Sequence, residues 1–133
     1  MFLVYFASFK KKPNKKTKFK KVNNITTAFG NGSATSVNGP VSIATINYPM
    51  GISINPITQE VYIAENTLKS IGNIRGWNRT SQSVRTVYGA LPYLPNYLDF
   101  QNDGTLFFTD TNGELMKLDS NGLFVYFYFL ESK

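Results

Sequence analysis

An internal repeat constrains this chain more than any other feature of its sequence. The segment YPMGISINPITQEVYIAEN, which begins at Tyr48, aligns with LPNYLDFQNDGTLFFTDTN, which begins at Leu94, at an offset of 46 residues that falls to 45 after one deletion. The aligned positions are Pro49 with Pro95, Ile52 with Leu98, Ile54 with Phe100, Ile63 with Phe108, and Glu65 with Asp110. A period of this length, with short strand-like runs, fits a unit of four strands and is too strand-rich for a helical solenoid. The repeat therefore predicts an all-β chain.

Turn residues divide each unit into four expected strands. In the first unit, which spans residues 49–89, we expect strands at 51–55, 60–65, 70–78 and 84–89. In the second unit, which spans 95–129, we expect them at 97–101, 105–110, 115–119 and 123–129. The turns at 55–58, 102–104 and 121–122 contain Asn, Asp, Pro and Gly, which adopt turn dihedrals at low cost. Each unit is thus predicted to be an antiparallel sheet.

The segment before the first unit resembles a known repeat family. ITTAFGNG, from Ile25, aligns weakly with VRTVYGAL, from Val84, and leads through small residues to a proline, a Gly-Ile strand, a turn and the strand Val-Tyr-Ile-Ala-Glu. This order resembles the blade junction of NHL-repeat β-propellers, although the Asn-His-Leu triplet that names the family is missing. The resemblance covers residues 25–129 and implies an incomplete β-propeller of about two four-stranded antiparallel blades, preceded by an outer strand at 25–29.

Two blades are too few for a closed ring, because propellers of this kind need four to eight. Residues 123–130, LFVYFYFL, are eight consecutive apolar or aromatic residues, and such a run at a sheet edge favours pairing with another chain. The chain is therefore interpreted as a fragment of a larger propeller. Assembly of several copies through exposed blade edges, and closure by pairing of residues 1–6 with the terminal strand, are the alternatives.

Residues 1–24 form a separate region, with an apolar start followed by a lysine-rich arm. The start, MFLVYFASF, is too short to span a membrane, and the lysines follow it instead of preceding it as in a secretory signal. We expect the arm to be disordered and able to bind polyanions. Its basic residues are Lys10, Lys11, Lys12, Lys15, Lys16, Lys18, Lys20 and Lys21. The compartment stays open, with the cytoplasm favoured over secretion.

The sequence contains no histidine and no cysteine, which excludes imidazole bases, thiolate metal sites and Cys-His nucleophile pairs. We therefore expect no catalytic residue, no metal site and no cofactor. Glu65 and Asp110 end equivalent strands, where they could bind a cation in a central channel or accept hydrogen bonds from backbone amides of the next turn. The repetition at equivalent positions favours the structural role.

A basic and aromatic group lies near the end of the third strand and the start of the fourth strand of the first unit. Its members, which we predict to form an interaction surface, are Arg75, Trp77, Arg79 and Arg85. The sequence thus indicates a non-enzymatic protein-interaction module. The alternative is RNA binding, as in some relatives with NHL propellers, through the lysine arm and these arginines.

Overall fold

The computed structural model describes residues 26–67 and 71–118, together with the backbone of residues 124–127. The chain is all-β, and these residues contain no helix. The strands are β1 (Gly39–Pro40), β2 (Pro49–Ile54), β3 (Val61–Thr67), β4 (Ile71–Asn78), β5 (Ser83–Leu91), β6 (Pro95–Phe100), β7 (Leu106–Asp110), β8 (Leu115–Leu118) and β9 (Phe124–Phe127).

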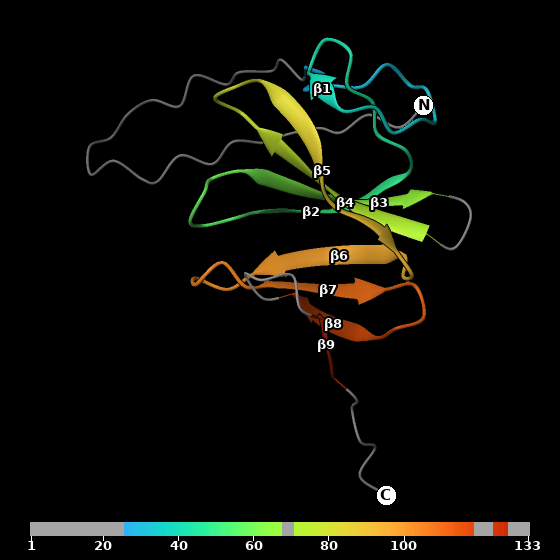
Figure 1. Ribbon diagram of the computed structural model, residues 1–133, viewed down its shortest axis with the longest axis vertical. Helices are drawn as coiled ribbons and strands as arrows, with labels where there is room; N and C mark the ends of the chain where they lie inside the picture. The colour runs from blue at the N-terminus through green and yellow to red at the C-terminus, as the bar shows by residue number, and fades with distance from the viewer. Residues whose placement is uncertain (1–25, 68–70, 119–123, 128–133) are drawn as a thin grey trace, which may run out of the picture.

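The strands form two antiparallel sheets, stacked one on the other in Figure 1. The first sheet has the order β1-β5-β4-β3-β2, and the second has the order β6-β7-β8-β9. Apart from β1, each strand pairs with its neighbour in sequence, as expected for strands joined by short turns. The eight strands predicted from the repeat all overlap β2 to β9 within the described residues, so the all-β, antiparallel part of the prediction is confirmed.

The two units also share one pairing register. Pro49 lies opposite Glu65 in the first sheet, as Pro95 lies opposite Asp110 in the second. Both β2 and β6 carry an irregularity just after that proline. Since a proline has no N–H to donate, a break in the ladder at this point is expected. The prediction that the two aligned segments fold alike is therefore confirmed.

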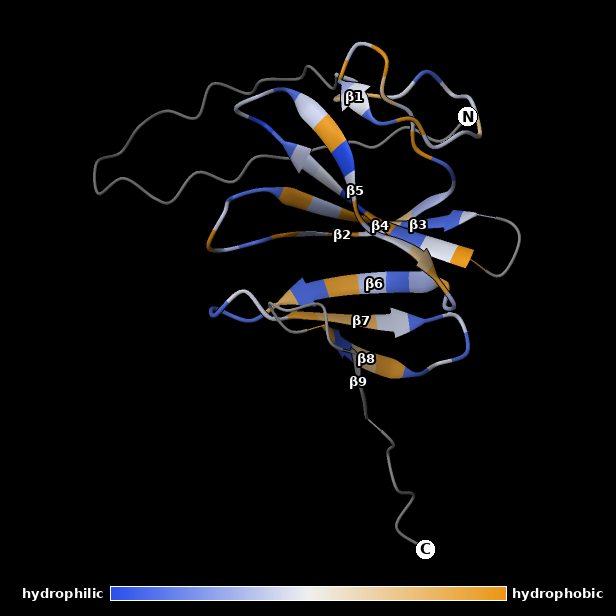
Figure 2. Cartoon of the chain, in the orientation of Figure 1, coloured by the Kyte–Doolittle hydropathy of each residue, from blue (hydrophilic) through white to orange (hydrophobic). Residues whose placement is uncertain are grey.

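Apolar side chains of both sheets form one core between them. It contains Tyr62, Ala64, Ile74 and Leu91 of the first sheet with Leu98, Leu106, Phe108, Met116 and Leu118 of the second. Figure 2 shows apolar and polar residues alternating along β6, as expected for a strand with one buried face. The core forms because every second residue of these strands points inward, and these inward residues are apolar.

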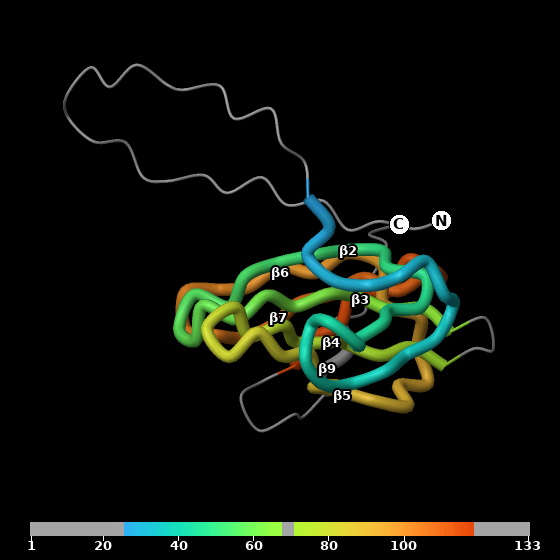
Figure 3. The backbone as a smooth tube through the Cα atoms, turned by 90° about the horizontal axis from the view of Figure 1, so that it is seen from above, coloured from blue at the N-terminus to red at the C-terminus, as the bar shows by residue number. Residues whose placement is uncertain are grey.

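Residues 26–48 cover the other face of the first sheet. Phe29, Ala44 and Ile46 pack there with Val61, Ile63, Trp77 and Val84 in a second core. Seen from above in Figure 3, this segment passes across the sheet. The prediction of an outer strand at 25–29 is wrong, because residues 26–29 form no strand; residue 25 lies outside the described residues. Phe29 instead packs edge-on against Trp77, with the two ring centres 5.8 Å apart, because the covered sheet face offers apolar side chains in which its ring is buried.

Candidate functional site

An ion pair between Glu65 on β3 and Arg75 on β4 is buried under the covering segment. The Arg75 Nη1 to Glu65 Oε1 distance is 2.8 Å, and neither side chain is exposed. Arg75 pairs with Ile63, two residues before Glu65, so strand alternation places both charged side chains on the covered face. Burying two charges is costly unless their remaining donors and acceptors are also satisfied.

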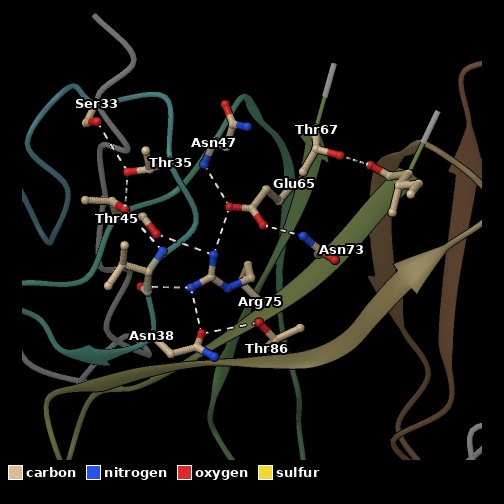
Figure 4. A network of polar contacts seen from close by, with 12 residues as sticks. Ser33, Thr35, Asn38, Thr45, Asn47, Glu65, Thr67, Asn73, Arg75 and Thr86 are labelled. Carbon is tan, nitrogen blue, oxygen red and sulfur yellow. Dashed lines mark hydrogen bonds and ion pairs between the residues drawn. The ribbon is translucent and has the colours of Figure 1, made fainter. Parts of the chain in front are cut away.

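The surrounding hydrogen bonds, drawn in Figure 4, supply those partners. Arg75 Nη2 donates to the carbonyl of Val37 at 3.0 Å and to Asn38 Oδ1 at 2.8 Å. The backbone N–H of Asn47 donates to Glu65 Oε1 at 2.7 Å, and the side-chain Nδ2 of Asn73 donates to Glu65 Oε2 at 2.8 Å. The ion pair thus binds the segment between Val37 and Asn47 to the sheet.

Asp110, the repeat partner of Glu65, is used differently. Its Oδ1 accepts hydrogen bonds from the amides of Asn112 at 2.8 Å and Glu114 at 2.9 Å. The position equivalent to Arg75 is Met116, which lies opposite Phe108 as Arg75 lies opposite Ile63. Both carboxylates therefore accept backbone amides, as predicted. For Glu65, however, the amide comes from the loop before β2 and not from the next turn.

The predicted interaction surface of Arg75, Trp77, Arg79 and Arg85 is not one surface. Arg75 and Trp77 are buried on the covered face, at 0% and 9% exposure. Arg79 lies in the exposed turn between β4 and β5. Arg85 lies opposite Gly76, one residue out of step with Arg75 and Trp77, so it is on the other face of the sheet, where it pairs with Glu60 at 2.7 Å. Nearness in sequence was misleading because neighbouring strand residues alternate between faces.

A cavity of about 240 Å³ lies between the two sheets, beside the turn after β2 and the turn after β6. Its lining consists of Asn55, Ile57, Thr58, Tyr62, Tyr88, Phe100, Asp103, Gly104 and Leu106. Asn55 shapes the first turn, since its Oδ1 accepts the amides of Ile57 and Thr58. Gly104 shapes the second, with a φ of 86° that favours glycine.

The wall of this cavity is mainly aromatic, and one of its polar groups, the Asp103 carboxylate, is charged. Tyr62 and Phe100 meet edge to face, with ring centres 5.0 Å apart and planes at 88°. Burial, together with the nearby Glu60 carboxylate, raises the pKa of Tyr62 above its ordinary value. The Thr105 amide, 2.9 Å from Asp103 Oδ1, holds the pKa of that exposed carboxyl below its usual range. The cavity therefore combines apolar rings with a negative charge at its edge.

None of the lining residues is among the site residues predicted from the sequence. The repeat is the one sequence feature that could have indicated this site. The turns at 55–58 and 102–104 are equivalent in the two units, so stacking of the units brings these turns together. Only the packing of the sheets shows that a space remains between them.

No protein-family model and no curated protein matches this chain. Within residues 26–67, 71–118 and 124–127, no helix is long and apolar enough to cross a membrane. The same part of the chain contains no group of three or more acidic side chains placed to hold a metal ion. The predicted polyanion-binding lysines at 10–21 lie outside the described residues.

Proposed function

We propose that this chain is a non-enzymatic protein-interaction module, built as part of an NHL-type β-propeller. Two stacked four-stranded meanders with the same register and the same break after a proline support the propeller assignment. In such an architecture the strand-connecting turns at one end of the sheets form a shared surface. That end is where we place the partner.

The cavity between the turns is the observation that carries this proposal. Its volume of about 240 Å³ is below the roughly 300–1,000 Å³ of sites that bind small molecules or cofactors. A single side chain of a protein partner is the better match in size. Aromatic pockets filled by one inserted side chain are typical anchors of protein interfaces. The half-buried Tyr88 and Phe100 would form the contact, and the exposed Ile57 would extend it.

RNA binding remains the alternative function, but its arginine part is weaker than the sequence indicated. Arg75 is buried and paired with Glu65, so it is not available as a phosphate contact, and the more exposed Arg85 is already paired with Glu60. The alternative therefore depends on the lysine arm. Affinity for RNA that falls steeply with salt, and that deletion of residues 10–21 abolishes, would support it.

A peptide selection tests the protein-interaction proposal. We expect the full chain to select binders from a displayed library of random dodecapeptides. Thr58→Trp should place a large ring at the exposed edge of the cavity, and Tyr88→Ala should remove part of its wall. Each should lower the affinity of a synthetic selected peptide, measured by fluorescence anisotropy, at least about tenfold, because removing one anchor contact costs about 2 kcal/mol.

Ile43→Ser is the matched control, because Ile43 is 60% exposed and lies in the covering segment away from the cavity lining. Its peptide affinity should equal that of the unchanged chain. Circular dichroism establishes that each variant is folded. Peptides that bind all variants equally, or a selection that yields none, would contradict the proposal.

A further inference from the structure

The cavity between the turns offers an occupant both aromatic rings and a negative charge. Its lining passes from buried to exposed residues: Tyr62 and Leu106 are buried, Tyr88 and Phe100 are half-buried, and Asp103 is exposed. Among the described residues that line the cavity, Asp103 alone is ionised at neutral pH. The chemistry of the lining therefore distinguishes between partner side chains of different charge.

The Asp103 carboxylate has room for a further hydrogen-bond donor. Its Oδ1 accepts the backbone N–H of Thr105 at 2.9 Å, whereas a carboxylate can accept about four hydrogen bonds. Within the described part of the chain it forms no ion pair, and the Lys117 ammonium acts on it only from a distance. The charge is thus accessible to a cation that enters the cavity.

Two further charges lie beside Tyr62, and they compensate each other. The buried Glu60 carboxylate accepts hydrogen bonds from Arg85 Nε at 3.2 Å and from Arg85 Nη2 at 2.7 Å. Arg85 also forms a hydrogen bond with the Tyr62 side chain. Because the carboxylate and the guanidinium are paired, they neither attract nor repel an incoming side chain strongly. Asp103 therefore sets the sign of the charge that the cavity favours.

An arginine side chain matches this combination of groups. Its guanidinium is planar, stacks on aromatic rings and donates two parallel hydrogen bonds to a carboxylate. Its apolar stem can contact Ile57 and Leu106 of the lining. An apolar side chain would contact the same rings but gain nothing from Asp103, and an acidic side chain would be repelled by it.

We propose that the side chain that enters the cavity is an arginine of the protein partner, bound by the aromatic rings and by the Asp103 carboxylate. This inference rests on the proposed function, in which one partner side chain fills the cavity, and it adds the chemical identity of that side chain. The partner should accordingly present an exposed arginine on the surface that meets the two turns.

Selected dodecapeptides whose affinity Thr58→Trp lowers are the probes for this inference, because they bind at the cavity. We expect each to contain an arginine whose replacement by citrulline, which has a similar shape but no charge, raises the dissociation constant at least about fivefold. Fluorescence anisotropy at about 0.15 M salt, where the Debye length is about 8 Å, screens the charges of lysines elsewhere in the chain.

Asp103→Asn removes the charge on the protein side of the contact. The asparagine side-chain oxygen can still accept the Thr105 N–H, so the turn should remain folded, which circular dichroism checks. The variant should weaken binding of the arginine peptide at least about threefold. It should leave the affinity of the citrulline analogue unchanged, because the two replacements remove the same interaction.

Glu114→Gln is the matched control, since it removes a carboxylate charge from the exposed turn after β7, whereas Asp103 lies in the turn before β7, at the other end of this strand. The arginine peptide should bind this variant as it binds the unchanged chain.

The outcomes separate this inference from the proposed function. Cavity-binding peptides that contain no arginine, or whose arginines can all be replaced by citrulline without loss, overturn the inference and leave the protein-interaction module in place. An arginine peptide that binds Asp103→Asn and the unchanged chain equally well overturns it too. A selection that yields no cavity-binding peptide overturns both.

Discussion

At the scale of single residues, Arg75 joins two parts of the molecule that are distant in sequence. It reaches from β4 to Val37 and Asn38, thirty-eight and thirty-seven residues earlier, while holding the Glu65 carboxylate. Such a buried pair stabilises the fold only as a complete set, because the loss of one partner leaves the other charge without compensation.

Arg75→Met should therefore lower the free energy of unfolding by about 3–5 kcal/mol. The substitution keeps a long apolar side chain but leaves Glu65 charged and buried. Urea unfolding, followed by circular dichroism, measures the change. A loss below about 1 kcal/mol would contradict the structural role assigned to this ion pair.

Arg79→Met is the matched control for that substitution. Arg79 is exposed in the turn after β4, and its guanidinium donates to the Gln59 carbonyl at 3.4 Å, close to the limit for a hydrogen bond. Surface changes of this kind stay within about 0.5 kcal/mol. The double variant Arg75→Met/Glu65→Leu should recover part of the lost stability, since no unpaired charge remains.

At the scale of the elements, β2 of the first sheet and β6 of the second sheet approach each other closely. Gly51 makes it possible, because a Cβ at this position would meet the backbone of residues 96 and 97. Backbone atoms cannot rotate away as the end of a flexible side chain can. The glycine is therefore needed for packing at this position and not for an unusual φ angle.

Gly51→Ala should destabilise the chain by about 1–3 kcal/mol, the range found for overpacked cores. Thermal or urea unfolding checks this value. Ser53→Ala serves as control, because Ser53 lies two residues further along the same face of β2 and alanine adds no atom there. Equal stability of the two variants would show that the sheets can separate at this point without cost.

At the scale of the whole molecule, the two sheets share one core and should unfold together. Trp77, the single tryptophan of the sequence, lies in the first sheet, and Phe108 is buried in the second sheet at 1% exposure. The fluorescence of Trp77 can thus report on a change made in the other sheet.

Phe108→Ala should lower the free energy of unfolding by about 3–5 kcal/mol, as expected for an emptied aromatic site in a core. The Trp77 fluorescence transition and the circular dichroism transition should shift together to lower urea. Phe107→Ala, one residue away on the other face of β7, should cause a smaller loss, because Phe107 is only half-buried. A Trp77 transition that Phe108→Ala leaves in place would mean that the sheets unfold independently.

Strands β2 to β9 and the turns between them could be predicted from the sequence because the information is local, whereas β1, which pairs with the distant β5, was not predicted. Alternating apolar residues define a strand, Asn55 and Gly104 define turns, and the 46-residue offset links two copies of the pattern. Even the opposition of Pro49 with Glu65, repeated by Pro95 with Asp110, follows from equivalent turns of similar length.

The use of each strand face was decided by the tertiary structure. Alternation says that Arg75 and Trp77 share a side of β4, but only the path of residues 26–48 buries that side and removes Arg75 from the surface. The same holds for the cavity, which exists because two stacked sheets leave a space between equivalent turns. The alternation of side chains along a strand shows which residues share a face. Whether that face is buried depends on what packs against it, and the packing elements come from distant parts of the chain.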